Sequence, residues 1–301
     1  MRPFHTEILR VLLYYDIWAY PLTARELFTF LPVHSLSFEE FERSLDAHGP
    51  GPNISTHEGH YFVTGRTAAI VEQRSIKERH AKTLWSWARI SMHVIKRFPF
   101  VRAIIVSGDL SKNATTPKSD VDFFIITEPG RLWIARTLLI LFKKIFLLNN
   151  KKFFCLNYFT DASHLTLAEQ NIFLATEIAH LKPLFNSELF FRYLDANRWI
   201  KNYFPNFSIH SFVLPTTNNR LGFLQKLFEL PFSFLPADSL DSYLLNRMKV
   251  IWANRYPQYD DETRERLFRC TKHESRAYVG NFEEKILTLF NQKMKEYGVA
   301  N

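Results

Sequence analysis

The sequence predicts a mixed α/β (α+β) fold in which a small mixed β-sheet is flanked by helices. Two observations predict the sheet: an apolar run at residues 101–106 ends at a glycine, and a second run at 123–126 follows an acidic tripeptide. A third observation is helical apolar spacing over most of the remaining chain, whose 301 residues are 47% hydrophobic. We therefore expect a helical N-terminal module, the sheet, and a mostly helical C-terminal region.

The first 64 residues predict three short helices followed by a β-hairpin. Thr6–Asp16 has helical apolar spacing, and Thr23 and Ser37, each with a glutamate three residues later, match the capping box that begins a helix. A hairpin is expected over residues 54–64, with its turn at Glu58-Gly59. This order of elements is that of a winged helix.

The predicted third helix of this module has a charge that disfavours DNA. In a DNA-reading winged helix, that helix would enter the major groove. Its acids outnumber its single basic residue here: Glu39, Glu40, Glu42 and Asp46 against Arg43. We therefore expect a structural or protein-docking role for the module, with DNA binding as the less favoured alternative.

The rest of the chain divides into two further regions. A long helix is expected over residues 66–97, then strands at 101–106 and from Asp120, a helix at 132–148 and a strand at 152–160. Helices are predicted beyond it at 166–181, with Pro183 as its stop, and at 187–196, 221–230, 239–254 and 281–297. We expect a winged-helix-like module at 1–64, a sheet domain with its leading helix at 65–164, and a helical region at 165–301.

The candidate functional residues cluster around the first two strands. Gly108 permits a tight turn against which a ligand phosphate could lie. Strand alternation places Asp120 and Asp122 on one face, where two carboxylates repel unless a proton or a cation intervenes. Hard oxygen ligands favour Mg²⁺ or Mn²⁺. The structural alternative, a solvated Asp122 at a sheet edge, is disfavoured because the strand is otherwise apolar.

The pattern Gly108-Asp109, ten residues, then Asp120-Val121-Asp122-Phe123 resembles the signature of the DNA polymerase β-like nucleotidyltransferase superfamily. The resemblance covers residues 101–127. It implies a metal-dependent enzyme that transfers a nucleoside monophosphate from an NTP to an acceptor, whose identity the sequence does not give. It also assigns Asp120 and Asp122 to the metal, and the nucleotide to Gly108, Asp109, Ser111, Lys112 and Ser119.

Two departures from that signature affect the expected chemistry. Asp109 occupies the place of a small phosphate-contacting residue, so its charge opposes a phosphate. The third acid of the superfamily has no equivalent on the 152–160 strand except Asn157, with Asp161, of the same strand parity, as a substitute. Two readings follow: an active nucleotidyltransferase, or a catalytically impaired module that senses a nucleotide and docks a partner.

Charge favours an anionic ligand. The net charge is +8, and residues 130–160 contain basic residues without an acid: Arg131, Arg136, Lys143, Lys144, Lys151 and Lys152. For each of these residues singly, a solvated surface position is the favoured interpretation.

The remaining residue types predict a cytoplasmic globular protein. Cys155 and Cys270 are far apart and suit reduced thiols. We expect no signal peptide, no membrane span and no membrane partner. The histidines, His180 and His273 among them, show no zinc-ligand spacing.

Overall fold

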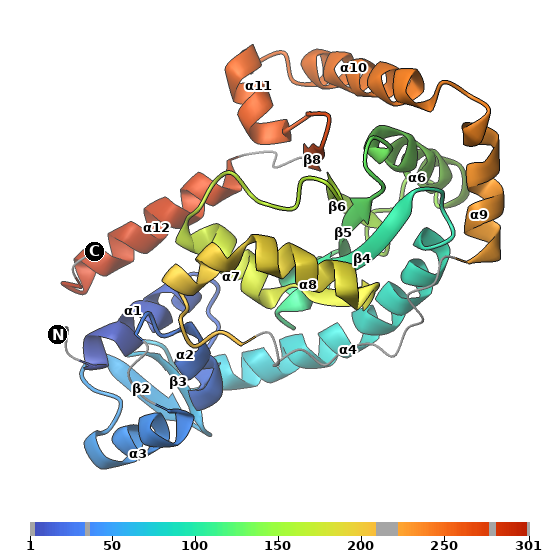
Figure 1. Cartoon of the computed structure of the whole chain (residues 1–301). Helices are drawn as coiled ribbons and strands as arrows, with labels where there is room; N and C mark the ends of the chain where they lie inside the picture. Colours follow the sequence, from blue (N-terminus) through green and yellow to red (C-terminus); the bar gives the residue numbers. More distant parts are fainter. Residues whose placement is uncertain (1–3, 34–36, 209–221, 277–280, 300–301) are drawn as a thin grey trace.

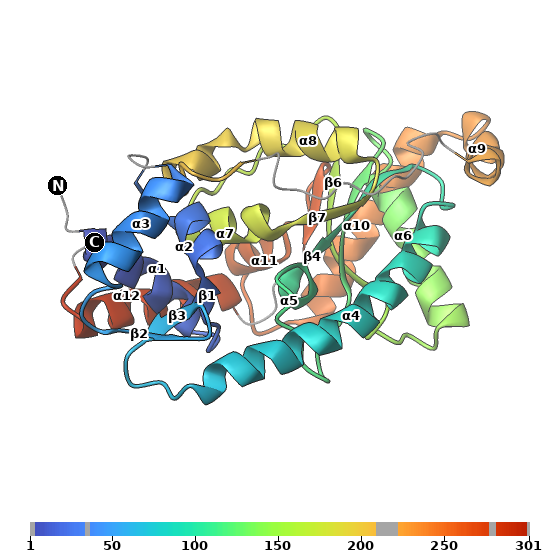
Figure 2. The ribbon, with the colours of Figure 1, turned by 90° about the horizontal axis from the view of Figure 1, so that it is seen from below.

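The computed structural model describes residues 4–33, 37–208, 222–276 and 281–299. The fold is mixed α/β, with two open sheets flanked by helices, as predicted (Figures 1 and 2). None of the helices in these ranges is long and apolar enough to cross a bilayer.

The N-terminal module consists of three helices and a small antiparallel sheet. The sheet has the order β1-β3-β2, and the predicted hairpin is present. The predicted capping boxes at Thr23 and Ser37 are both formed, with Glu26 and Glu40 as their partners. The elements are α1 (Phe4–Asp16), β1 (Leu22–Thr23), α2 (Ala24–Phe30), α3 (Phe38–His48), β2 (Ile54–His57) and β3 (His60–Val63).

The central sheet has five strands in the order β7-β4-β5-β6-β8. The long helix α4 (Ala69–Ile95) leads into it from the N-terminal module (Figure 1). Strands β5 and β6 are parallel and are joined by α6 (Leu132–Phe146), whereas the other neighbouring pairs are antiparallel. The strands are β4 (Val101–Ser107), β5 (Asp122–Thr127), β6 (Cys155–Asp161), β7 (Lys182–Phe185) and β8 (Glu274–Arg276), with the short helix α5 (Gly108–Ser111) after β4.

Two strands of this sheet, β7 and β8, lie in the region expected to be helical. Pro183, predicted to follow the end of a helix, lies inside β7, an edge strand where its missing N–H is tolerated. The preceding helix is shorter than predicted. The sheet therefore extends well past residue 164, the predicted end of the sheet domain.

The other predicted C-terminal helices are present, and α8 has the predicted bounds. Helix α11 was not predicted. The remaining helices are α7 (Ile172–His180), α8 (Ser187–Ala196), η1 (Arg198–Asn202), α9 (Phe223–Glu229), η3 (Leu230–Ser233), α10 (Ala237–Arg255), α11 (Asp261–Phe268) and α12 (Phe282–Glu296).

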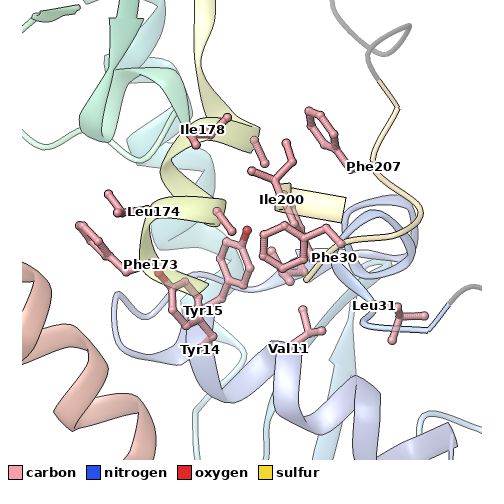
Figure 3. Close-up of a cluster of buried hydrophobic side chains, with 14 of the residues drawn as sticks. Val11, Tyr14, Tyr15, Phe30, Leu31, Phe173, Leu174, Ile178, Ile200 and Phe207 are labelled. Carbon is pink, nitrogen blue, oxygen red and sulfur yellow. The ribbon is translucent and has the colours of Figure 1, made fainter. Parts of the chain in front are cut away.

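Both faces of the central sheet are covered by apolar cores. Along β5, Phe124 and Ile126 face a core shared with the N-terminal module, α7, α8 and α12. Phe123 and Ile125 face a second core with α4, α6 and α11. Figure 3 shows the first core, where Tyr15 of α1 packs against Phe30 of α2, with ring centroids 5.3 Å apart. The N-terminal module and the sheet thus share one hydrophobic core.

Polar contacts join the first and last described helices. Asp16, at the end of α1 and only 7% exposed, accepts hydrogen bonds from Arg66 and from Lys293 of α12, each at 2.7 Å. Tyr14 of α1 also packs edge-on against Phe290 of α12. The two views agree that α1 and α12 lie side by side.

His180 is a titratable group within the shared core. Its ring stacks on Phe30 with centroids 4.9 Å apart, and its Nε2 lies 3.4 Å from the Tyr15 hydroxyl. Burial, helped by the charge of Lys112, lowers the pKa of His180 to about 3. The folded protein therefore holds this imidazole neutral at pH values where the unfolded chain protonates it.

We predict that acid destabilises the protein through His180. A folded-state pKa below the unfolded value means that stability is full above about pH 6.5 and declines as the pH falls toward 3, by about 5 kcal/mol at most. His180→Gln removes this part of the pH dependence, measured by urea unfolding from pH 7.5 to 4. The exposed His48, substituted in the same way, is the control. An unchanged pH profile in His180→Gln would contradict the assignment.

Candidate functional site

A cavity of about 470 Å³ lies where the polar ends of β4 and β5 meet the shared core. Its wall is rich in aromatic side chains from the N-terminal module, the sheet and α7, α8 and α12. The aromatic lining residues are Tyr15, Trp18, Tyr20, Phe124, Tyr158, Phe173, Tyr193 and Phe282. Polar and charged groups include Lys77, Ser107, Asp109, Lys112, Asp122, Asn157, Glu177 and Arg276. Such a mixture suits a ligand with one flat apolar part and one charged part.

Gly108 forms the corner of the cavity, as the sequence predicted. It follows β4 directly and has φ +65°, a left-handed conformation that favours glycine. A Cβ atom at this position would lie 2.4 Å from Oδ2 of Asp122, which pairs with Ser107 across β4 and β5. Only glycine therefore lets the Asp122 carboxyl group approach the turn this closely.

The Asp122 carboxyl group is poor in cationic partners. Burial, and also the nearby charges of Asp120 and Asp109, raises its pKa to about 6, although the Cys155 thiol acts as a hydrogen-bond partner. Lys112 supplies an opposite charge, but its Nζ lies 2.7 Å from Glu177 Oε1. A bound cation would relieve this concentration of negative charge.

Asp120 lies near Asp122 but does not line the cavity. Strand β5 begins at Asp122, so the strand alternation expected to align the two carboxylates does not extend to Asp120. Asp120 is partly buried, and its charge raises the pKa of Asp122. The structure thus brings the two acids close together without placing both in the cavity wall.

Asn157 lines the same cavity as Asp122 because β6 carries a bulge. Phe123 pairs with Leu156, but the next residue of β5 pairs with Tyr158, which leaves Asn157 as the extra residue. The bulge turns the Asn157 position toward the cavity that Asp122 also lines. Asn157 thus lines the same cavity as Asp122, one of the two acids that it was expected to face.

Asp161, the predicted substitute for the third acid, lies at the other end of β6. It pairs with Thr127, whereas Asp122 pairs with Cys155. Five residues of strand separate Asp122 from Thr127, roughly 16 Å at the usual rise. The bulge at Asn157 also breaks the parity on which the substitution relied. The prediction that Asp161 could take this role was wrong.

The two predicted phosphate-contacting serines are engaged within their own loop. Ser111 is buried, and its hydroxyl donates to the Gly108 carbonyl at 2.8 Å. Ser119 is buried and donates to Oδ2 of Asp109 at 2.7 Å. Neither serine lines the cavity, whereas Gly108, Asp109 and Lys112 do.

The basic stretch of residues 131–152 does not surround the cavity as a group. Arg136 is 7% exposed, lies over the rings of Trp133 and Phe159, and burial lowers its pKa to about 10. Arg131 pairs with Asp238. Lys143 lies close enough to Asp120 for their charges to interact, and burial lowers its pKa. Lys144, Lys151 and Lys152 are exposed.

Several cavity residues escaped the sequence analysis. Tyr15, Trp18 and Tyr20 were assigned to a separate module, yet they form part of the wall. Lys77 comes from α4, where its Nζ donates to the Trp18 carbonyl at 3.1 Å. The aromatic density between Tyr14 and Tyr20 was the available signal, but it is equally typical of a core.

Comparisons of the chain with protein-family models, with curated proteins and with solved structures found no match.

We predict that Gly108→Ala destabilises the protein more than the same change at Gly49. Both glycines have φ near +67°, but a Cβ at position 49 meets nothing within 4 Å, whereas one at position 108 meets Asp122. Gly49 has φ 67° and ψ 176°, a region essentially restricted to glycine, so Gly49→Ala should cost about 1–3 kcal/mol for the backbone conformation alone.

The contact with Asp122 adds to that cost at position 108. In an Asp122→Ala background, Gly108→Ala should fall to the Gly49 value, since the clash is gone; urea unfolding of the four variants measures this. Equal costs at the two glycines would show that Asp122 does not constrain the turn.

Proposed function

We propose that this protein is a divalent-metal-dependent nucleotidyltransferase, which transfers a nucleoside monophosphate from an NTP to an acceptor. One observation carries the proposal: Gly108 and Asp122 are in close contact at the corner of a cavity that Asn157 also lines. Gly108 and Asp122 belong to the signature, whereas Asn157 lies on the strand from which the resemblance expects a third acid; the three residues lie in or directly after the adjacent strands β4, β5 and β6.

The cavity offers complementary surfaces for the two parts of a nucleotide. Its volume lies within the usual range for small-molecule sites, roughly 300–1,000 Å³. The rings of Tyr158 and Phe124, 4.7 Å apart, and the neighbouring Trp18 and Tyr20 supply stacking surface for a base. Lys77 and Lys112 lie on the polar side with Gly108, where a phosphate chain would lie.

The acidic residues fit a divalent cation. Asp122, with Asp120 near it, offers oxygen donors and excess negative charge, and Asn157, which lines the same cavity, carries an amide oxygen. Mg²⁺ held there would neutralise phosphate charge and lower the pKa of the attacking hydroxyl group. Asn157 has no basic group, so it orients a ligand through its amide but does not remove a proton.

Nucleotide binding without transfer is a second candidate function. Two observations favour it: Asp109 lines the cavity with a charge that opposes a phosphate, and Asn157 occupies the position of an acid. In that case the protein is a nucleotide sensor. Product formation from an NTP distinguishes transfer from sensing.

The charge of the N-terminal module favours a protein partner, whether the protein transfers a nucleotide or only binds one. Its order, α1-β1-α2-α3-β2-β3, is that expected for a winged helix. The surface of α3 is acidic, and Glu39, Glu42 and Asp46 are exposed. We infer that this surface binds a basic region of a protein, because it repels the phosphates of DNA.

We predict that Mg²⁺ or Mn²⁺ together with an NTP raises the melting temperature, and that Asp120→Asn with Asp122→Asn abolishes the rise. Ligands that bind only the folded state stabilise it, by about 2.7 kcal/mol at a concentration of a hundred times Kd. Differential scanning fluorimetry with each NTP measures the shift. Asp46→Asn, on α3, is the matched control. A full shift in the double variant would place the metal elsewhere.

We also predict that Asn157→Asp increases the affinity for Mn²⁺, since a carboxylate replaces a neutral amide in the cavity that Asp122 also lines. Isothermal titration gives the affinity, and release of pyrophosphate from each NTP gives the turnover. Faster turnover in Asn157→Asp supports transfer. A variant that folds but binds Mn²⁺ no better would remove Asn157 from the proposed metal site.

A further inference from the structure

A cluster of possible metal ligands lies at the end of β6 remote from the cavity. Asp161 ends the strand, His164 follows it after a tight turn, and His273 comes from the segment that enters β8. One ligand atom from each of the three lies within 4.8 Å of the others. His273 is more than a hundred residues from Asp161 and His164 in sequence, and the pairing of β6 with β8 brings it to them.

The distances between the ligand atoms of Asp161 and each histidine are close to those between the ligands of a bound ion. Nδ1 of His273 lies 2.7 Å from Oδ2 of Asp161, and Nδ1 of His164 lies 3.8 Å from Oδ1. Ligand atoms about 2.0–2.1 Å from a tetrahedral Zn²⁺ are roughly 3.3 Å from each other. The two observed separations bracket this value, and the stacked histidine rings must turn relative to each other for both to direct a lone pair at one ion.

The backbone around the cluster is held in place. Thr160 donates through its hydroxyl group to the carbonyls of His164, at 2.7 Å, and His273, at 3.2 Å. The Asp161 N–H donates to the same His273 carbonyl. These bonds connect the backbones of both histidines to the last two residues of β6, as expected for preorganised ligands.

The Asp161 carboxylate is fully buried without a permanently charged partner. It is 0% exposed and accepts hydrogen bonds from the N–H and hydroxyl group of Ser163, at 2.9 and 2.6 Å. Within the described ranges, its ion-pair partners are the two histidines, and no lysine or arginine pairs with it. A buried carboxylate is ordinarily paired with a cation or a metal ion.

The two imidazole rings stack face to face, with centroids 3.5 Å apart and planes 11° apart. A neutral imidazole offers one nitrogen lone pair, in the plane of its ring, to a metal ion. His164 is largely exposed and His273 is partly exposed, so the cluster opens to solvent on the histidine side.

We propose that Asp161, His164 and His273 form a binding site for a transition-metal ion of the Zn²⁺ class. Two imidazoles and one carboxylate are a nitrogen-rich ligand set, which suits Zn²⁺ better than Mg²⁺. Three protein ligands leave a fourth position for solvent. The bound ion links the segment before β8 to the end of β6 and thus stabilises this edge of the sheet.

Zinc titration of the chelator-treated full-length protein tests this proposal. We expect calorimetry to show one Zn²⁺ bound per chain, with a rise in melting temperature, and His164→Asn to weaken binding at least tenfold. His164 is exposed, so this variant should fold; His273→Asn, checked by circular dichroism, is the second variant. His93→Asn, which changes an exposed histidine of α4, should bind as the wild type does.

Other outcomes overturn the proposal. No stoichiometric Zn²⁺ binding by the wild type, or binding that survives both His164→Asn and His273→Asn, would exclude a site at this cluster. The response to Mn²⁺ with an NTP should be unchanged in His164→Asn, because the cavity lies at the other end of β6. A negative result for one of the two sites therefore does not count against the other.

Discussion

The burial of β4 and β5 on both faces is the constraint on which the rest of the structure depends. From Ile104 to Val106 and from Phe123 to Ile126, the side chains of this antiparallel pair are at most 2% exposed. A polar side chain cannot lie in the middle of such strands without a partner. The polar groups are therefore confined to the strand ends. The cavity with Asp122 lies at one end of the sheet, and the cluster of Asp161, His164 and His273 at the other.

The sequence predicted those structural features that depend only on residues close together in the chain. The capping boxes at Thr23 and Ser37, the glycine turn at Gly108 and the bounds of α8 all follow from a few neighbouring residues. Strands β7 and β8 could not be predicted in this way. They are short, one contains a proline and the other is polar, and they are strands only because β4 and β6 offer them free edges.

The candidate site was predicted in part, for the same physical reason. Gly108, Asp109, Lys112, Asp122 and Asn157 line one cavity, because adjacent strands bring them together. Ser111 and Ser119 do not line the cavity, because their hydroxyl groups donate hydrogen bonds to Gly108 and Asp109 instead. The contribution of the N-terminal module, and the pairing of His273 with Asp161, arise from tertiary packing between segments distant in sequence. Residue spacing carries no information about such contacts.

The packing of α1 against α12 has a consequence for folding during synthesis. The core around Ile8 and Leu12 also contains Ile286, Phe290 and Met294, and Asp16 is bonded to Lys293. Helix α1 emerges from the ribosome before α12, and this part of its core is complete only after α12 has been made. At a usual rate of about 5–20 residues per second, α1 must wait on the order of tens of seconds with apolar surface exposed. The apolar face of α1 that α12 covers in the folded protein is therefore open to other contacts during that interval.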